Sequence, residues 1–139
     1  MIERKINHVN IGDKEYPAFC DLRVLEKLQD KYETITKFER ELLGKKLVYD
    51  EDGNPERNED GSLVKEDVEG SIRAIVDGLY LMIQEGQRLE GEKDLITEDE
   101  IYSCIGNPYL LKYIVHSLFY SCFESKKKET TDTNKKTKK

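Results

Sequence analysis

The chain has 139 residues, of which 37% are charged, and its formal net charge is −6. This length is enough for one domain with a hydrophobic core and too short for two comfortable ones. No apolar run approaches the roughly 18–20 residues of a membrane span, and the N-terminus lacks the apolar segment of a signal peptide. These features argue against a membrane protein and predict a cytosolic one.

The N-terminal residues predict a β-hairpin followed by a helix. Apolar residues from Ile2 to Phe19, on both sides of Gly12-Asp13, indicate the hairpin. Asp21 is a suitable N-cap for the helix. Its predicted apolar face contains Leu22, Leu25, Leu28 and Tyr32.

A second short helix and an acidic insert follow. Thr36 and Glu39 form a capping box, and Gly44 marks the end of this helix. Between residues 45 and 67, two brief apolar runs flank turn-rich acidic sequence, which predicts an excursion such as a flexible second hairpin. We expect residues 47–64 to be a dispensable acidic insert.

Residues 66–85 predict the clearest core helix, with Gly86 at its C-terminal stop. Its apolar residues recur on one face: Val68, Ile72, Ile75, Val76, Leu79, Met82 and Ile83. Thr97 with Glu100 forms a capping box for a short helix, and Pro108 begins the last one. The predicted fold is therefore α+β and mostly α, with a short N-terminal β-hairpin, about five helices, an acidic insert and a disordered C-terminal tail.

The charge is distributed unevenly between a body, residues 1–124, and a tail, residues 125–139. The seven lysines of the tail outnumber Glu129 and Asp132 by five, so the tail carries +5 and the body −11. An acidic body argues against nucleic-acid binding. From residue 126 on the tail has no apolar side chain to bury, which predicts a disordered, lysine-rich segment. A solubilising terminus explains it most simply, and a basic arm that contacts nucleic acid or an acidic protein surface is the alternative.

The sequence offers no motif for catalysis, a cofactor or a metal site. Asp50-x-Asp52-x-Asn54 imitates the start of a calcium loop, but Pro55 and Gly61 stand where that loop needs glycine and glutamate. Neither His8 nor His116 has a cysteine or carboxylate partner at ligand spacing. The cysteines, Cys20, Cys104 and Cys122, are odd in number and widely spaced among apolar residues, which predicts reduced thiols in the core. We expect a protein that is not an enzyme and holds no cofactor or metal.

The last helix, residues 107–124, is apolar or aromatic on two sides. A broad arc predicts the core face: Leu110, Leu111, Ile114, Val115, Leu118, Phe119, Cys122 and Phe123. A narrow stripe lies nearly opposite: Tyr109, Tyr113, His116 and Tyr120. Tyrosine joins a large apolar ring to a hydroxyl and is enriched where proteins meet. We therefore predict that the stripe binds a partner protein or a second copy of the chain. The alternative is that loops or the N-terminal strands cover it, and the exposed edge of the hairpin is the next candidate interface.

The order of elements resembles the tail assembly chaperones of long-tailed bacteriophages, small proteins encoded between the tail tube protein and the tape measure protein. The matching stretches are the hairpin at 6–19, the helix at 22–32 ending in Lys-Tyr, the helix start at 34–38, and the passages 79–86 and 95–101. The resemblance covers most of residues 5–124. The insert and the tail have no counterpart in it.

This resemblance implies a non-enzymatic chaperone that keeps the tape measure protein soluble in the host bacterial cytoplasm until tube subunits displace it, and that is absent from the mature virion. In this family a longer form, made by ribosomal frameshifting, often recruits the tail tube protein. Lysine pairs such as Lys127-Lys128 are compatible with a slippery coding sequence. The alternative is a small structural adaptor, a head-to-tail connector or tail-completion protein, that stays in the virion.

Overall fold

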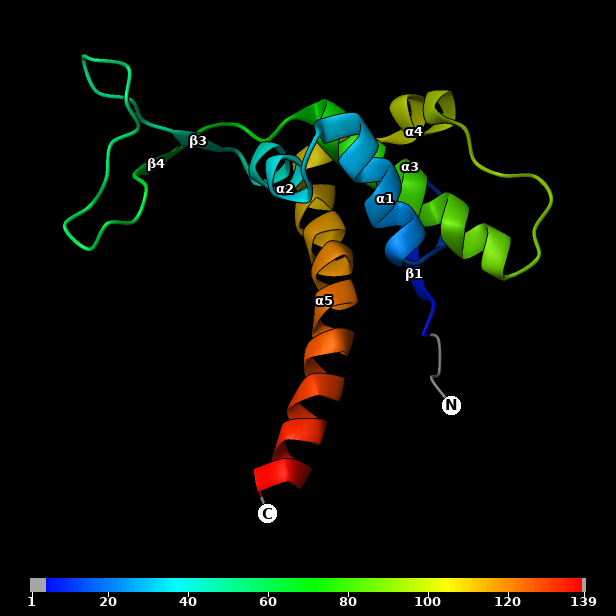
Figure 1. The fold of residues 1–139 in the computed structure, drawn as a ribbon. Helices are drawn as coiled ribbons and strands as arrows, with labels where there is room; N and C mark the ends of the chain where they lie inside the picture. Colours follow the sequence, from blue (N-terminus) through cyan, green and yellow to red (C-terminus); the bar gives the residue numbers. More distant parts are fainter. Residues whose placement is uncertain (1–4, 139) are drawn as a thin grey trace.

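The structure is a computed structural model that describes residues 5–138, with side chains up to residue 123. Two β-hairpins and five helices follow in the order β1-β2-α1-α2-β3-β4-α3-α4-α5 within these residues. Figure 1 shows α1 to α4 and the first turns of α5 close together, with the N-terminal hairpin beside α1 and α3, while the second hairpin stands apart from them. The predicted α+β, mostly α fold is therefore confirmed.

The N-terminal hairpin pairs β1 (Asn7–Ile11) with antiparallel β2 (Lys14–Ala18). The two-residue turn between them contains Gly12 at a φ of +62°, a conformation that glycine adopts without strain. One face of the pair is buried in the core and contains Val9, Ile11, Tyr16 and Ala18. The predicted hairpin is confirmed from β1 onward, and residues 1–4 lie outside the described part of the chain.

Helix α1 (Leu22–Tyr32) begins where predicted, because an Asp21 side-chain oxygen accepts the backbone N–H groups of Arg23 and Val24 at 3.0 and 3.2 Å. Its buried residues are Val24, Leu25, Leu28 and Tyr32. The prediction that Leu22 shares this face is wrong, since Leu22 is exposed. At ~100° per residue Leu22 lies about 110° around the helix from the centre of the buried arc.

Helix α2 (Ile35–Leu43) begins two residues earlier than predicted. The capping box of Thr36 and Glu39 is wrong, because the N-cap is Thr34, whose hydroxyl accepts the N–H three residues later at 3.0 Å. Thr34 has extended dihedral angles, whereas Thr36 already lies inside the helix. Gly44 ends the helix as predicted, with a φ of +80°.

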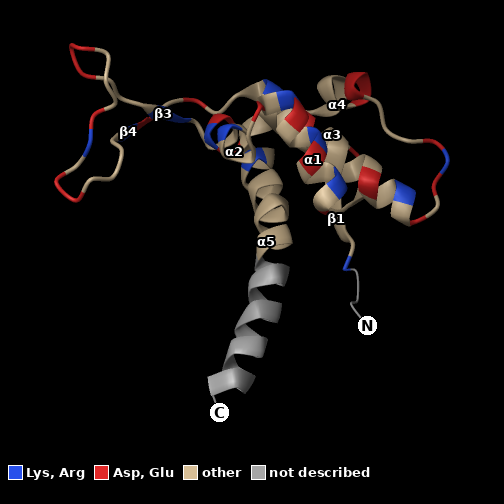
Figure 2. Ribbon diagram, in the orientation of Figure 1, with Lys and Arg blue, Asp and Glu red and all other residues tan. Residues whose placement is uncertain are grey.

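The acidic insert belongs to a second hairpin, residues 45–69, which we call the arm. Strand β3 (Lys45–Leu47) pairs antiparallel with β4 (Lys65–Asp67). Beyond these strands the backbone of Glu56 bonds to both Val48 and Val64, which divides the arm into two small loops. No residue from 45 to 69 is buried, and acidic residues lie at both loop tips (Figure 2). The insert lies outside the core, as predicted.

Helix α3 (Ile72–Leu89) is the central core helix, but it begins later than predicted. Ser71 caps it by accepting the N–H of Ala74 at 3.2 Å, and the residues before Ser71 belong to β4 and a connecting segment. The expectation that Val68 and Ile72 contribute to the buried face is wrong, because both are exposed. From Ala74 to Gln87, α3 is buried on nearly all sides by the hairpin and the other helices.

Gly86 does not end α3, contrary to the prediction. A Cβ atom at this position would lie 2.6 Å from the backbone N of Ala18 and the backbone C of Pro17. The glycine therefore allows β2 to lie directly against the helix, and the N–H of Phe19 donates to the carbonyl of Met82 at 2.9 Å. This contact fixes the N-terminal hairpin on α3.

Helix α4 (Glu98–Cys104) is capped as predicted, since the Thr97 hydroxyl accepts the N–H of Glu100 at 3.2 Å. Helix α5 spans Pro108–Lys138. Its bounds extend over the predicted disordered tail, residues 125–139, but the side chains of that tail and all of residue 139 lie outside the described part, so the prediction stays a prediction. Among the described residues, no helix is both long enough and apolar enough to cross a membrane.

Candidate partner-binding surface

Helix α5 is rotated relative to the orientation that its sequence predicts. Val115, Leu118 and Phe119 are buried, as expected, but Leu110 and Ile114 of the predicted core arc are 70% and 40% exposed. The buried face is therefore turned by about 40° toward the predicted tyrosine stripe, at ~100° per residue. The expectation that the whole arc is core is wrong at these two residues.

The rotation divides the predicted stripe into two pairs. Tyr113 and Tyr120 are 67% and 47% exposed. Tyr109 is partly buried and packs against the hydrophobic core. His116 is also partly buried, and its Nε2 atom lies 2.9 Å from the Glu39 carboxylate of α2. Tyr109 and His116 thus hold α5 in place, while Tyr113 and Tyr120 remain accessible to a partner.

His116 also orders the aromatic rings beside it. Its ring stacks on Phe119 at a centroid distance of 6.4 Å and meets the edge of Tyr120 at 5.3 Å. Phe119 in turn contacts Phe38 of α2 at 5.5 Å. The exposed Tyr120 ring is therefore supported from behind by a chain of rings that leads into the core.

The exposed residues of α5 form one continuous side of the helix, which we call the outer face. It consists of Leu110, Tyr113, Ile114, Ser117 and Tyr120. Four of these five side chains are large and apolar or aromatic. Beside them Lys112 reaches over the Tyr113 ring, with its Nζ atom 5.1 Å from the centroid. Such a cluster on one helix face is a recurrent mark of a protein–protein contact.

A groove of about 320 Å³ lies between the outer face and strand β1. Its lining consists of Asn7, His8, Val9, Tyr113, Ile114, Ser117 and Leu118. The lining contains no Asp, Glu, Lys or Arg, and the Nε2 atom of His8 lies 3.9 Å from the Glu90 carboxylate. One residue of the predicted stripe, Tyr113, thus lies on the α5 wall of the groove, and strand β1 of the N-terminal hairpin forms the opposite wall.

The hairpin wall of the groove presents an open strand edge. Because the turn has two residues, Ile11 and Lys14 form a hydrogen-bonded pair, and the backbone groups of His8 and Asn10 point away from β2. Pro17, which has no N–H to donate, lies opposite His8 and agrees with this register. Outside the ladder, no backbone–backbone hydrogen bond of the described residues involves His8 or Asn10.

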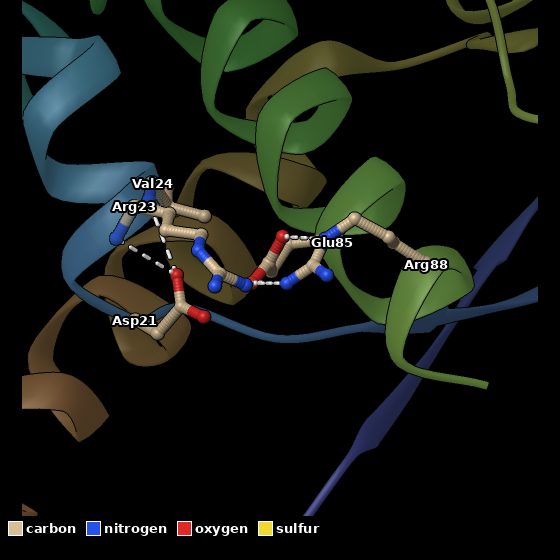
Figure 3. Close-up of polar contacts among 5 residues, drawn as sticks. All are labelled: Asp21, Arg23, Val24, Glu85 and Arg88. Atoms are coloured by element: carbon tan, nitrogen blue, oxygen red, sulfur yellow. Dashed lines mark hydrogen bonds and ion pairs between the residues drawn. The ribbon is translucent and has the colours of Figure 1, made fainter. Parts of the chain in front are cut away.

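Two buried polar clusters, around Glu85 and Asp77, join α1 to α3, and none of their residues lines the groove. Glu85 of α3 accepts two hydrogen bonds from the Arg88 guanidinium at 2.9 and 2.7 Å and lies 3.8 Å from Arg23 of α1 (Figure 3). The Arg88 guanidinium lowers the pKa of Glu85 to about 2. Burial and a hydrogen bond to Glu85 raise the pKa of the α1 cap, Asp21. This cluster fixes the start of α1 on α3.

A second polar cluster lies around Asp77 of α3. The Asp77 carboxylate, almost fully buried, accepts hydrogen bonds from the Tyr32 hydroxyl at 2.6 Å and the Lys31 ammonium at 2.9 Å. Burial and this hydrogen bond raise the pKa of Tyr32 well above its ordinary value. With its charge paired and its oxygens bonded, Asp77 ties α1 to α3.

The groove can accept apolar side chains, and the open edge of β1 can form backbone hydrogen bonds with a partner. Among the described residues, no three His, Cys, Asp or Glu side chains are placed to hold a metal ion. Helical periodicity placed Tyr113 and Tyr120 in the predicted partner-binding stripe, and both are exposed. It placed Leu110 and Ile114 in the core face, and the observed orientation of α5 shows that these two are exposed as well.

No protein-family model, curated protein or solved structure matches this chain.

Proposed function

We propose that this chain is a tail assembly chaperone of a long-tailed bacteriophage or prophage. It would bind the tape measure protein in the host cytoplasm, keep it soluble and help recruit tail tube subunits, without catalysis. The observation that carries this proposal is the continuity of the outer face with the groove beside β1. The order of elements that resembles this family supports it as well.

The physical demands on such a chaperone agree with this surface. A long helical client must be held firmly enough to stay soluble and loosely enough to be displaced by tube subunits. Apolar and aromatic contact area without buried charge provides this kind of reversible contact. An amphipathic client helix can lay its apolar side on the outer face and insert one anchoring side chain into the groove, in the manner of helix-in-groove recognition.

The acidic body has a second role in this proposal. The body carries −11, whereas the groove lining contains no Asp, Glu, Lys or Arg, so the complex with an apolar client keeps a charged exterior. Net charge far from zero opposes self-aggregation and maintains solubility. A complex of this kind stays dispersed although both proteins expose apolar surface on their own.

Co-expression tests the proposal directly. The chain is produced together with the tape measure protein that this proposal expects to be encoded downstream of its gene, and the soluble fraction of that client is measured. We expect the double variant Tyr113→Ala, Tyr120→Ala to lose most of the client from the soluble fraction, since aromatic anchors contribute about 2 kcal/mol or more each. Tyr102→Ala is the matched control, because Tyr102 is 45% exposed on α4, away from the groove.

Purified virions distinguish the chaperone from the structural adaptor. A chaperone is displaced during assembly and should be missing from the mature particle, whereas a connector or tail-completion protein should be present in stoichiometric amounts. Sedimentation of the isolated chain, with and without the double substitution, shows whether the same surface also mediates self-association. Unchanged client solubility and unchanged association in the double variant would contradict the assignment of this surface.

A further inference from the structure

Two residues on the groove side of β1 have backbone groups without a backbone partner in the described part of the chain. His8 and Asn10 alternate with residues that bond to β2, so their N–H and C=O groups point away from that strand. Among the described residues, neither takes part in another backbone–backbone hydrogen bond, and both are exposed. Strand β1 therefore presents two donors and two acceptors along one wall of the groove.

This edge lacks the features by which proteins usually protect a free strand. Exposed edges are commonly blocked by Lys, by Pro or by a covering segment, because they otherwise pair with another strand. His8 and Asn10 are neither Lys nor Pro. The opposite wall, which includes Tyr113 and Ile114 of α5, leaves a groove of about 320 Å³ open beside β1. The edge is thus free to accept a further strand.

A helical partner cannot use these backbone groups. The N–H and C=O groups inside a helix bond to one another, so a client helix on the outer face gives β1 side-chain contacts only. An extended segment has free backbone groups at the same spacing as those of β1. Every second side chain of such a segment lies beside Val9, where Ile114 and Leu118 also line the groove.

We propose that an extended segment of the client adds to β1 as a third strand beside the N-terminal hairpin. This inference rests on the proposed function, in which a client helix lies on the outer face, and it assigns the β1 edge to a stretch adjoining that helix in the client chain. In this kind of strand addition, main-chain hydrogen bonds provide affinity, and the groove beside alternate side chains provides specificity.

The groove also defines the chemistry of the segment. Its lining contains no Asp, Glu, Lys or Arg, so an inserted charge would be buried without an opposite charge, and every second side chain must be apolar. Glu90 lies beside His8, and the body carries −11, which favours Lys or Arg next to the apolar stretch. The lysine-rich tail of this chain does not meet the first demand, since it has no apolar residue from 126 on.

A synthetic peptide tests the strand site on the full chain. The probe is acetyl-Lys-Thr-Val-Thr-Val-Thr-Val-Lys-amide with a fluorescent label, and its affinity is measured by fluorescence anisotropy. Two further peptides carry N-methyl groups on either the threonine or the valine amides, so that only one of them loses the N–H groups that face β1. We expect one methylated peptide to bind about 10-fold more weakly than the other. Absence of binding by the parent peptide, or equal affinity of the two methylated ones, overturns the proposal.

A proline variant tests the same hydrogen bonds from the side of the protein. Asn10→Pro removes one outward N–H and keeps the ladder to β2, because that N–H does not bond to β2. We expect the peptide affinity to fall by about 10-fold, and the co-expressed client to leave the soluble fraction, at an unchanged circular dichroism spectrum. Asn10→Ala keeps the N–H and is the matched control, which should bind like the parent chain. The methylated peptides need no variant, so they decide the matter even if Asn10→Pro does not fold.

The outcomes separate this inference from the proposed function. Loss of the client in Tyr113→Ala, Tyr120→Ala but not in a folded Asn10→Pro would mean that the outer face alone holds it, which overturns the strand and leaves the chaperone. A parent chain that does not keep the client soluble, while the methylated peptides still differ, overturns the chaperone and leaves the strand site. A parent dimer that Asn10→Pro dissociates would assign the edge to a second copy and overturn the client as its occupant.

Discussion

Val115 of α5 lies directly on Gly78 of α3. A Cβ atom at Gly78 would lie 2.6 Å from the Val115 Cγ1 atom and 3.2 Å from the Phe38 ring of α2. The missing side chain thus creates the space in which three helices meet. Gly78→Ala should destabilise the fold by about 1–3 kcal/mol in urea unfolding, because the added methyl overpacks a close contact.

A second substitution tests whether this contact is the cause. Gly78→Ala combined with Val115→Ala should recover part of the lost stability, since the shorter side chain removes the clash. Gly106→Ala is the control, because its Cβ atom would meet nothing within 4 Å. Equal stability of Gly78→Ala and the parent would show that α3 and α5 pack differently.

Leu118 and Leu110 offer a direct comparison of the two sides of α5. Leu118 is buried, so Leu118→Ala should cost about 2–5 kcal/mol of unfolding free energy. Leu110 is mostly exposed, and Leu110→Ala should change stability by less than about 0.5 kcal/mol. Both are measured by urea denaturation, and a larger loss at Leu110 than at Leu118 would reverse the assigned orientation of the helix.

Local signals predict most of the fold, because caps and turns depend on neighbouring residues. Asp21, Thr97 and Gly44 act as predicted, and so does the hairpin turn at Gly12. One failure is local, since Thr34 and not Thr36 caps α2, and the others arise where tertiary contacts decide. Gly86 reads as a helix end in sequence, but it is a point of close contact with β2.

Only part of the candidate surface could be predicted from the sequence, because tertiary contacts also determine which residues of α5 are exposed. The apolar residues of α5 extend around more than one face, so helical periodicity does not determine which of them face the core. The contact of Val115 with Gly78 and the polar contact of His116 with Glu39 at 2.9 Å set the rotation, and Gly78 and Glu39 are both far away in sequence. The groove itself needs β1, which no pattern within α5 reveals.

Acid should weaken the cluster around Glu85. In the folded chain the pKa of Glu85 is lowered from 4.5 to about 2. The ionised carboxylate therefore stabilises the fold fully at pH values above 4.5, the pKa that Glu85 has in the unfolded chain. This contribution is lost as the pH falls from about 4.5 toward 2. Asp21 has a raised pKa and acts in the opposite direction, which makes the net slope shallower.

We therefore expect Glu85→Gln to flatten the dependence of unfolding free energy on pH between about 4.5 and 2, when urea titrations are compared at several pH values. Glu66→Gln, at an exposed position of β4, is the control and should keep the slope of the parent chain. A slope in Glu85→Gln as steep as in the parent would assign the acid sensitivity to other carboxylates.

The arm should be removable without loss of the fold. None of its residues is buried, and its internal hydrogen bonds, such as those from the N–H groups of Asp52 and Asn54 to the Asp50 carboxylate, stay within the arm. Replacing residues 50–61 by a short Gly-Ser link should therefore leave the circular dichroism spectrum and the cooperativity of thermal unfolding nearly unchanged, because the free energy of loop closure varies slowly with loop length. Gly44, at the base of the arm, should by contrast not tolerate substitution, because a Cβ atom there would clash with the carbonyl oxygen of Val68. Gly44→Ala should be destabilising even though the arm is dispensable, since Gly44 also needs its positive φ. Broad, non-cooperative melting of the shortened chain would mean that the arm contributes to the folded core after all.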